Sequence, residues 1–273
     1  MKDRLSASAA DLPLVATSGK QGTVGLLLMR SYLLAGNTGH YDGVITALEA
    51  RGLKVVPAFA TGLDNRPAIE NFFMKDGRPA IDALVSLTGF SLIGGPAYND
   101  ARAAEDILAT LDVPYLAVTP VEFQTLDHWG GSERGLLPVE ATMMVAIPEL
   151  DGATGSMVYG GRSGAAHVAC TGCSKGCTFE SVAGAHDMHS CSERADALSA
   201  RVARLINLRR AEKADRNKPM NVESDALRYD DLKQTSIFTG RVVLTKGTIL
   251  IRGARVEVRQ DAEGYQFGVV TAE

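Results

Sequence analysis

Short apolar runs alternate with amphipathic stretches along the chain from Thr23 onward. The apolar runs, bounded by glycine and proline, predict strands at residues 23–30, 53–60, 82–89 and 114–119. Apolar positions spaced three and four residues apart predict helices at residues 41–52, 67–74 and 99–111. Strands that alternate with helices form βαβ units with right-handed crossovers. We therefore expect an α/β fold, in which helices flank a mostly parallel sheet.

The loops that follow the strands are the expected place for a ligand, because ligands of parallel sheets bind beyond the carboxyl ends of the strands. These loops are residues 30–32 with 36–41, the stretch after Ala60, residues 88–100 and residues 119–135. The third loop contains Gly89, Gly94, Gly95 and Pro96, more turn residues than a strand-to-helix connection needs. It either has a binding role or needs these glycines only for tight turns.

A change of pattern divides the second half of the chain. Helices are predicted at residues 138–147 and 192–210, and the buried stripe of the second would be Ala195, Leu198, Val202, Leu205 and Ile206. Residues 211–218 are a polar linker, and the sequence after Pro219 is rich in β-branched residues. Antiparallel strands are predicted at residues 236–247, 248–261 and 264–273, with a free edge that allows self-association.

Composition narrows the class of function. The chain carries 28 Lys and Arg against 32 Asp and Glu, a formal net charge of −4, so a nucleic-acid partner is not expected. The opening residues lack the apolar segment of a secretory signal, and no run of about 18 apolar residues occurs. We therefore expect a cytoplasmic chain with no transmembrane segment. No phosphate-binding loop of the pattern G-x4-G-K-[ST] occurs, so no ATP site is expected either.

All four cysteines lie close together in the sequence. They are Cys170, Cys173, Cys177 and Cys191, and His167, His186 and His189 lie among them as alternate ligands. Thiolate and imidazole groups at such spacing can bind zinc or an iron–sulfur cluster. Two other interpretations stay open, a regulatory disulfide and an exposed insertion whose thiols bind nothing.

Several long segments carry a family resemblance. They are VGLLLMRSYLLAGNTGHYDGVITALEARGLKVVPAFATGLDNRPAIENFF, DALVSLTGFSLIGGPAYNDARAAEDILATLDVPYL, PVEFQTLDHW and LLPVEATMMVAIPELDGATGSMVYGGR. Through them, residues 21–210 resemble the porphyrin-binding H subunit of magnesium chelatase (BchH/ChlH), a relative of the CobN subunit of cobaltochelatase. That subunit is several times longer, so the resemblance implies a fragment, and we do not expect activity from it alone.

Residues 211–273 resemble a different family. Their segments NVESDALRYDD, FTGRVVLTKGTILIRGARVEVRQ and GYQFGVVTAE are similar to the start of the OstA/LptA domain, a periplasmic lipopolysaccharide carrier with an open jellyroll. This resemblance implies a partial jellyroll and an alternative function, a lipopolysaccharide- or lipid-binding transport module. The chain therefore resembles a join of two incomplete proteins, for which an artificial chimera, an assembly error and a genuine fusion all stay open. We expect five parts: a flexible lead-in (1–20), an α/β chelatase-like domain (21–160), a Cys/His-rich segment (161–191), a helix with a linker (192–218) and an OstA-like β segment (219–273).

The first resemblance implies a part in inserting Mg²⁺ into protoporphyrin IX during bacteriochlorophyll or chlorophyll biosynthesis. The enzyme class would be a ligase that forms nitrogen–metal bonds, with AAA+ motor subunits as partners that hydrolyse ATP. Insertion needs a pocket for a flat apolar macrocycle and groups that accept two pyrrole protons. The residues predicted to contact the tetrapyrrole are Arg30, His40, Phe90, Tyr98, Glu122, Gln124, His128 and Glu140. Each also has a structural alternative, such as capping a helix, and no catalytic residue is assigned.

Overall fold

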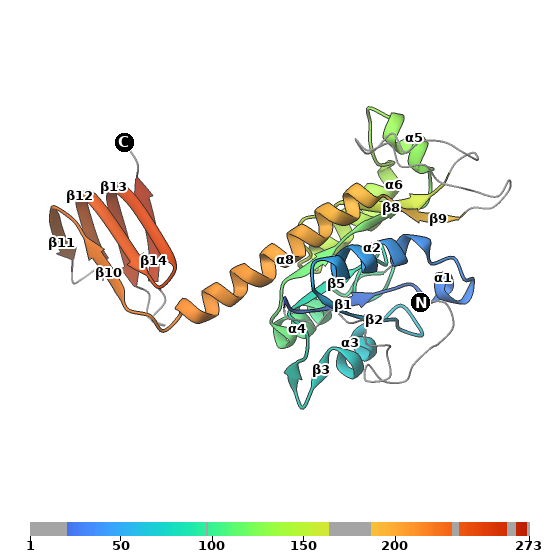
Figure 1. The fold of residues 1–273 in the computed structure, drawn as a ribbon, viewed down its shortest axis with the longest axis horizontal. Coiled ribbons are helices and arrows are strands. Elements are labelled where there is room, and N and C mark those ends of the chain that lie inside the picture. The colour runs from blue at the N-terminus through green and yellow to red at the C-terminus, as the bar shows by residue number, and fades with distance from the viewer. Residues whose placement is uncertain (1–20, 97, 164–186, 231–234, 261–265, 272–273) are drawn as a thin grey trace. The chain divides into compact units, whose positions relative to one another are not determined.

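The computed structural model describes residues 21–96, 98–163, 187–230, 235–260 and 266–271. The chain divides into two compact units, Met1–Ile206 and Asn207–Glu273. The first contains a parallel sheet with flanking helices and the second an antiparallel sheet, so the predicted fold class is confirmed (Figure 1). Within the described parts of the chain, no helix is both long and apolar enough to cross a membrane.

A four-stranded parallel sheet with the order β2-β1-β5-β6 forms the centre of the first unit. Its strands are β1 (Thr23–Leu27), β2 (Lys54–Ala58), β5 (Ala83–Ser86) and β6 (Tyr115–Ala117). The central strand β1 is buried on both faces, since Leu26 belongs to one apolar cluster and Leu27 to another. Burial on both faces explains why its sequence is apolar without interruption.

Helices cover both faces of this sheet. The four long ones are α2 (Gly39–Ala50), α3 (Arg66–Phe72), α4 (Ala101–Leu111) and α8 (Ser192–Asp215). Val44 of α2 and Val202 of α8 belong to the same cluster as Leu26. Ile69 of α3 and Ile107 of α4 belong to the cluster of Leu27. The sheet is therefore the middle of three layers, as expected from the strand and helix pattern.

Two short features complete this part of the first unit. Helix α1 (Arg30–Leu34) follows β1 directly and has no fully buried residue. It is attached to the protein through the partly buried side chains of Tyr32 and Leu33, which pack against the apolar cluster. Strands β3 (Met74–Lys75) and β4 (Arg78–Pro79) form a two-stranded hairpin after α3.

A second, three-stranded sheet continues the first unit. It contains β7 (Thr119–Val121), β8 (Val158–Arg162) and β9 (Met188–Ser190), with β8 in the middle. Gly161 of β8 allows this close pairing, because a Cβ atom at this position would lie 2.7 Å from the Val121 Cβ. Helix α5 (Leu126–Gly131) follows β7 and packs near β8.

The helix predicted at residues 138–147 is present but not regular. It consists of α6 (Pro138–Ala141), a π-helical turn (Thr142–Ala146) and α7 (Ile147–Leu150). Pro148 has no N–H group to donate to the carbonyl of Met144 four residues earlier. The Thr119 hydroxyl donates to that carbonyl instead, at 3.2 Å. A wide turn is thus accommodated where a proline would otherwise break the helix.

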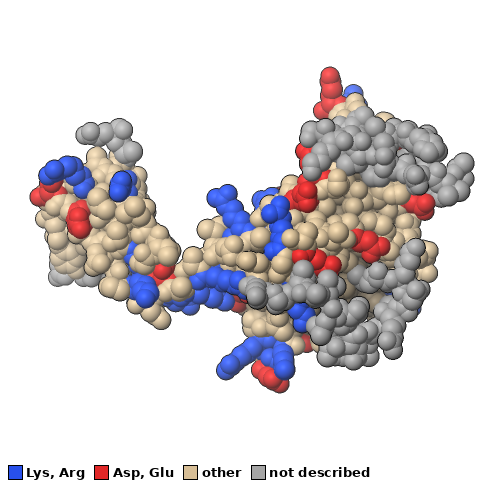
Figure 2. Space-filling model, viewed as in Figure 1, with Lys and Arg blue, Asp and Glu red and all other residues tan. Residues whose placement is uncertain are grey.

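Helix α8 extends five residues beyond its predicted end at 210, into residues 211–218 that were predicted to be a linker. The extension has a simple cause, since Ala211–Ala214 are good helix formers and the first helix-breaking residue is Pro219. The predicted buried stripe is confirmed, with Leu198 and Val202 at 0% exposure. Arg201, Arg204 and Arg210 are exposed, and Lys and Arg side chains (blue in Figure 2) follow this helix.

The second unit contains a five-stranded antiparallel sheet. Its strands are β10 (Met220–Glu223), β11 (Ala226–Asp230), β12 (Thr235–Lys246), β13 (Ile249–Gln260) and β14 (Gln266–Thr271). The predicted strands correspond to β12, β13 and β14, whereas β10 and β11, which both pair with β12, were not predicted. The unit has its own apolar cluster, formed by Val242, Leu244, Val256 and Val258.

Candidate ligand-binding site

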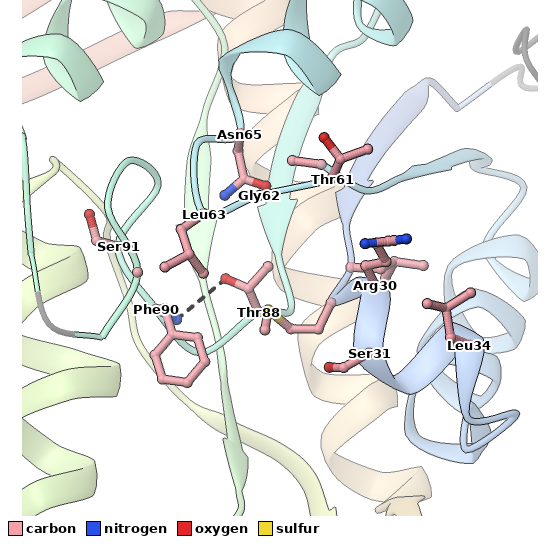
Figure 3. Close-up of a pocket in the computed structure, with 14 residues that line it drawn as sticks. Arg30, Ser31, Leu34, Thr61, Gly62, Leu63, Asn65, Thr88, Phe90 and Ser91 are labelled. Atoms are coloured by element: carbon pink, nitrogen blue, oxygen red, sulfur yellow. Dashed lines mark hydrogen bonds between the residues drawn. The ribbon is translucent and has the colours of Figure 1, made fainter.

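A cavity of about 400 Å³ lies where the loops after β1, β2 and β5 meet (Figure 3). Arg30, Ser31 and Leu34 of α1 form one side of it. The loop after β2 contributes Thr61, Leu63 and Asn65, and the loop after β5 contributes Thr88, Phe90 and Ser91. The cavity thus lies at the carboxyl edge of the sheet, as predicted, and its volume is typical of small-molecule sites, which span about 300–1,000 Å³.

The lining of the cavity combines apolar surfaces with a few polar groups. Leu34, Leu63 and Phe90 provide the apolar surfaces, and Leu34 and Leu63 are more than half exposed, so the cavity is open to solvent. Arg30 provides a positive charge at the same opening. In Figure 3 the labelled side chains come from all three loops. Such a lining suits a ligand that is largely apolar and carries a negatively charged group.

The loop after β5 is held in shape by its own hydrogen bonds. The hydroxyls of Ser86 and Thr88 lie 2.9 Å apart, and Thr88 Oγ1 accepts from the amide of Phe90 at 3.3 Å (dashed in Figure 3). Gly94 and Gly95 have φ of 114° and 73°, values that side chains rarely allow. The glycines of this loop are therefore needed for its turns, and the same loop also lines the cavity.

Asp151 connects this loop to the end of α7. Its buried carboxylate accepts hydrogen bonds from the Ser91 hydroxyl at 2.8 Å and the Leu92 amide at 2.7 Å. The side-chain amide of Asn99 donates to the other carboxylate oxygen. Asn65 Nδ2 donates to the carbonyl of Leu92 at 2.9 Å. The loops on two sides of the cavity are therefore fixed to one another before any ligand binds.

His40 lies in a buried aromatic group beside α1. Its ring is 0% exposed, with its centroid 3.7 Å from that of Tyr41 and 4.9 Å from that of Tyr32. Neither ring nitrogen has a hydrogen-bond partner among the described residues. Burial, with a smaller contribution from the charge of His189, lowers the pKa of His40 to about 3. The imidazole is therefore neutral at physiological pH.

Glu122 lies near Tyr32: burial, and to a smaller extent the charge of Glu122, raises the pKa of the Tyr32 hydroxyl. Burial raises the pKa of Glu122, and the charge of Glu140 acts in the same direction, while Tyr32 and Arg162 oppose the rise. The Oε1 atom of Glu122 is buried without a hydrogen-bond partner within the described residues. A carboxylate with a raised pKa and an unused lone pair is a suitable proton acceptor.

Gln124, His128 and Glu140 form a separate hydrogen-bonded group. Glu140 is 0% exposed and accepts from Gln124 Nε2 and from the amides of Phe123 and Leu137. Gln124 Oε1 lies 2.9 Å from His128 Nδ1. The polar atoms of Gln124 and Glu140 thus join the loop after β7 to the start of α6.

The eight predicted ligand contacts therefore divide among several places. Arg30 and Phe90 line the cavity, His40 and Glu122 flank Tyr32 behind α1, and Tyr98 is 63% exposed in the chain beyond Gly94. Tyr32, Asn65 and Thr88 lie in the loops that the sequence predicts to bind a ligand, but none of them is among the eight named contacts. Thr88 lies two residues after β5 and Asn65 directly before α3, so their place in these loops is the signal, whereas only the fold shows the contacts of Tyr32.

The predicted metal ligands Cys170, Cys173, Cys177, His167 and His186 lie outside the described residues. Cys191 is buried at 0% exposure beside Val121, Leu126 and Val158. His189 lies two residues before it on β9. In the described portion of the chain, no three His, Cys, Asp or Glu side chains come together as metal ligands.

Two family models match the two parts of the chain. Residues 5–218 match the family model CobN/Magnesium Chelatase. Residues 221–273 match a second model, described as LptA/(LptD N-terminal domain) LPS transport protein. Both resemblances stated from the sequence are confirmed, and the two matches meet between residues 218 and 221.

Individual relatives match the larger part of the chain. The H subunit of the magnesium chelatase of Cereibacter sphaeroides is 51% identical over 217 residues, and that of Rhodobacter capsulatus is 49% identical over 216 residues. Each match covers 79% of this chain and 18% of the relative, so the chain spans less than a fifth of their length. The catalytic subunit of cobaltochelatase from Mycobacterium tuberculosis is 22% identical, with a TM-score of 0.48, over 72% of this chain and 16% of that one.

Proposed function

Because this chain belongs to the CobN/magnesium chelatase family, we propose that its α/β unit binds a tetrapyrrole and takes part in the insertion of Mg²⁺. The observation that carries the proposal is the cavity at the carboxyl edge of the sheet, in a segment 51% identical to the H subunit of a magnesium chelatase. Protoporphyrin IX and Mg²⁺ are the substrates in this proposal, AAA+ motor subunits are the partners, and the location is cytoplasmic. The complete reaction is expected only together with those subunits.

The lining of the cavity supports a tetrapyrrole ligand. A porphyrin presents a flat apolar ring, for which Leu34, Leu63 and Phe90 offer contact surface. Its carboxylate substituents are anions, and Arg30 at the opening can pair with one of them through two parallel hydrogen bonds. The ring would thus be held with one carboxylate toward α1.

Metal insertion also requires proton acceptors, because Mg²⁺ replaces the protons on two pyrrole nitrogens. Glu122 is the proposed acceptor of one of them, since its pKa is raised and its Oε1 atom has no partner among the described residues. It does not line the cavity itself but lies near Tyr32 of α1, whose neighbours Arg30 and Ser31 do. Glu140 is less suited to this role, because amide donors already occupy both of its oxygens.

Titration of the protein with protoporphyrin IX, followed by quenching of porphyrin fluorescence, tests the proposal. We expect Arg30→Gln to raise Kd at least about tenfold, because the charge-assisted pair with the carboxylate is lost. Arg78→Gln is the matched control, since Arg78 is exposed on the β4 hairpin and does not line the cavity. Absence of quenching, or an equal effect of both substitutions, would refute tetrapyrrole binding at this cavity.

The antiparallel sheet supports a second proposed function, the binding of lipopolysaccharide or another lipid by residues 221–273. The match to the LPS transport model and the apolar cluster of Val242, Leu244, Val256 and Val258 favour it. Binding of lipopolysaccharide that is lost on deleting residues 219–273, and kept on deleting residues 23–160, would support this function. The opposite pattern with protoporphyrin IX would support the first.

Zinc or an iron–sulfur cluster at the four cysteines stays a prediction. Metal analysis of protein purified without oxygen tests it directly. A protein that contains neither zinc nor iron would contradict it.

A further inference from the structure

Two neighbouring strands leave the parallel sheet and continue directly into the wall of the cavity. At the end of β1, the amide of Leu28 still donates to β2 at 2.9 Å, and the next residue, Met29, lines the cavity. At the end of β5, the amide of Leu87 still donates to β1 at 2.9 Å, and the next residue, Thr88, lines the cavity. Backbone groups that are buried beyond the sheet need partners from elsewhere.

A buried tyrosine hydroxyl provides such a partner beyond β1. Tyr41 of α2 is 1% exposed, and its hydroxyl accepts from the amide of Met29 at 3.1 Å. Met29 is the residue directly before α1, whose Arg30 and Ser31 also line the cavity. Helix α1 has only five residues and none of them is fully buried, so it has little stability of its own. The Tyr41 hydroxyl therefore holds the point at which this side of the cavity begins.

A second buried tyrosine hydroxyl provides a partner beyond β5. Tyr159 of β8 is 0% exposed, and its hydroxyl donates to the carbonyl of Leu87 at 3.1 Å. The next residue, Thr88, lines the cavity and accepts a hydrogen bond from the amide of Phe90 (Figure 3). The Tyr159 hydroxyl therefore holds the start of the loop that carries Phe90.

The two tyrosines belong to one buried aromatic group. The centroid of the His40 ring lies 3.7 Å from that of Tyr41 and 6.0 Å from that of Tyr159, and the His40 and Tyr159 rings are within 15° of parallel. Both tyrosines also belong to the apolar cluster of Leu26. Close packing keeps the rings in one rotamer, so each hydroxyl keeps its direction. Burial raises the pKa of both hydroxyls, so both stay protonated.

We propose that Tyr41 and Tyr159 are positioning residues of the cavity: their hydroxyls fix the chain where it leaves β1 and β5, and thereby the places of Arg30 and Phe90. The hydroxyls come from two different elements, α2 and β8, but they act on strands that are neighbours in the sheet. Neither tyrosine lines the cavity, so both act through the backbone. The inference rests on the proposed function only for the identity of the ligand.

Hydrogen–deuterium exchange of the full chain tests the inference without any ligand. Tyr159→Phe keeps the ring but leaves the buried carbonyl of Leu87 without its donor. We therefore expect the amides of Thr88 and Phe90 to exchange about tenfold faster. The amide of Leu84, which donates to the Pro114 carbonyl inside the sheet, is the internal reference, because it exchanges only when the sheet opens.

Tyr41→Phe is the reciprocal variant. It removes the acceptor of the Met29 amide, so we expect faster exchange at Ala35 and Gly36, whose amides donate within α1. Each variant should leave the segment of the other unchanged, and if one of them does not fold, the other still tests the inference. A purely structural role would accelerate Leu84 by the same factor as the cavity segments. That result, or unchanged exchange in both variants, would overturn the inference.

Protoporphyrin IX binding then separates this inference from the proposed function. We expect Tyr41→Phe and Tyr159→Phe each to raise Kd several-fold. Ser199→Ala is the matched control, since Ser199 is also 0% exposed and its hydroxyl accepts from Arg51 Nε at 2.6 Å, but it does not line the cavity. This control should lower stability and leave Kd unchanged.

An equal rise of Kd in all three variants would contradict a positioning role. If wild type does not bind the porphyrin, the proposed function fails, while the exchange experiment still decides the role of the two tyrosines.

Discussion

The Ser91 hydroxyl donates a 2.8 Å hydrogen bond to the carboxylate of Asp151, 60 positions later in the chain. The Leu92 amide donates to the same oxygen, and Asn99 donates to the other one. Asp151 is 2% exposed, so these three donors replace the water that the carboxylate loses on folding. One acidic side chain thereby adds to the loop's own hydrogen bonds in fixing the segment that carries Phe90 into the cavity.

We expect Asp151→Ala to lower the free energy of unfolding by about 3 kcal/mol, because it leaves several buried donors without an acceptor. Chemical denaturation followed by the fluorescence of Trp129, the single tryptophan, measures this change in the first unit. Glu149→Ala is the matched control, since Glu149 is exposed two residues away, and it should change stability by less than about 0.5 kcal/mol. Equal stability of the two variants would show that the Asp151 contacts are not stabilising.

We expect Gly161→Ala to lower the free energy of unfolding by about 1–3 kcal/mol, the usual cost of overpacking. A methyl group at residue 161 would approach the Val121 backbone nitrogen to 2.9 Å, and the two strands would have to separate. Gly131→Ala is the control, because a Cβ atom there meets no neighbour within 4 Å. Thermal unfolding of both variants checks the prediction, which an unchanged Tm for Gly161→Ala would contradict.

His40 should make the first unit less stable in acid. Its pKa is about 3 in the folded protein and about 6.5 when exposed, so between these values the unfolded chain binds more protons. The stability that His40 contributes above pH 6.5 is therefore lost as the pH falls, by about 1.4 kcal/mol per unit.

The comparison with His40→Phe isolates this effect. Between pH 6.5 and pH 5.0, wild type should lose about 2 kcal/mol more than the variant, as measured by urea unfolding with Trp129 fluorescence. The pKa of His189 is also lowered by burial, but His189 is present in both proteins, so its own contribution to the pH dependence cancels in the comparison. The same pH dependence in both would mean that His40 is accessible to protons in the folded state.

Thr248 should control the ionisation of Asp215. The Thr248 hydroxyl and amide both donate to Asp215 Oδ2, and these hydrogen bonds lower the pKa of the carboxyl. In Thr248→Val the hydroxyl is lost, so the pKa of Asp215 should rise toward the ordinary value. NMR titration of the Asp215 side chain measures the rise, and Asp225, whose low pKa comes from Arg241, should not change.

The sequence predicts those helices and strands whose apolar pattern is set by burial alone. Strand β1 is buried on both faces, so its sequence is largely apolar, and α8 shows its buried stripe at the turns from Ala195 to Ile206. The end of α8 was predicted too early, because the residues from Ala211 onward are polar but still favour a helix. The five-part division of the chain stays a prediction.

Contacts between distant segments explain what the sequence could not predict. The π-helical turn depends on Pro148 and on Thr119, which lie 29 positions apart, and no local pattern joins them. Arg30 and Phe90 line the cavity as their place after strands predicts, because the sheet topology fixes that position, and their contact with a ligand stays a prediction. The edge-on contact between Tyr32 and His40 depends on α1 and α2 coming together, which only the folded chain shows.

The hydrogen bond from Thr119 to Met144 has a consequence for any attempt to transplant residues 138–150 into another scaffold. Within that helix, one carbonyl relies on a donor that the helix itself does not contain. A graft without a hydroxyl at the equivalent strand position would leave this oxygen unsatisfied, and the segment would straighten or unwind near Pro148. Residues 138–150 and β7 must therefore be transplanted together, although the chain between them contains α5 and a long loop.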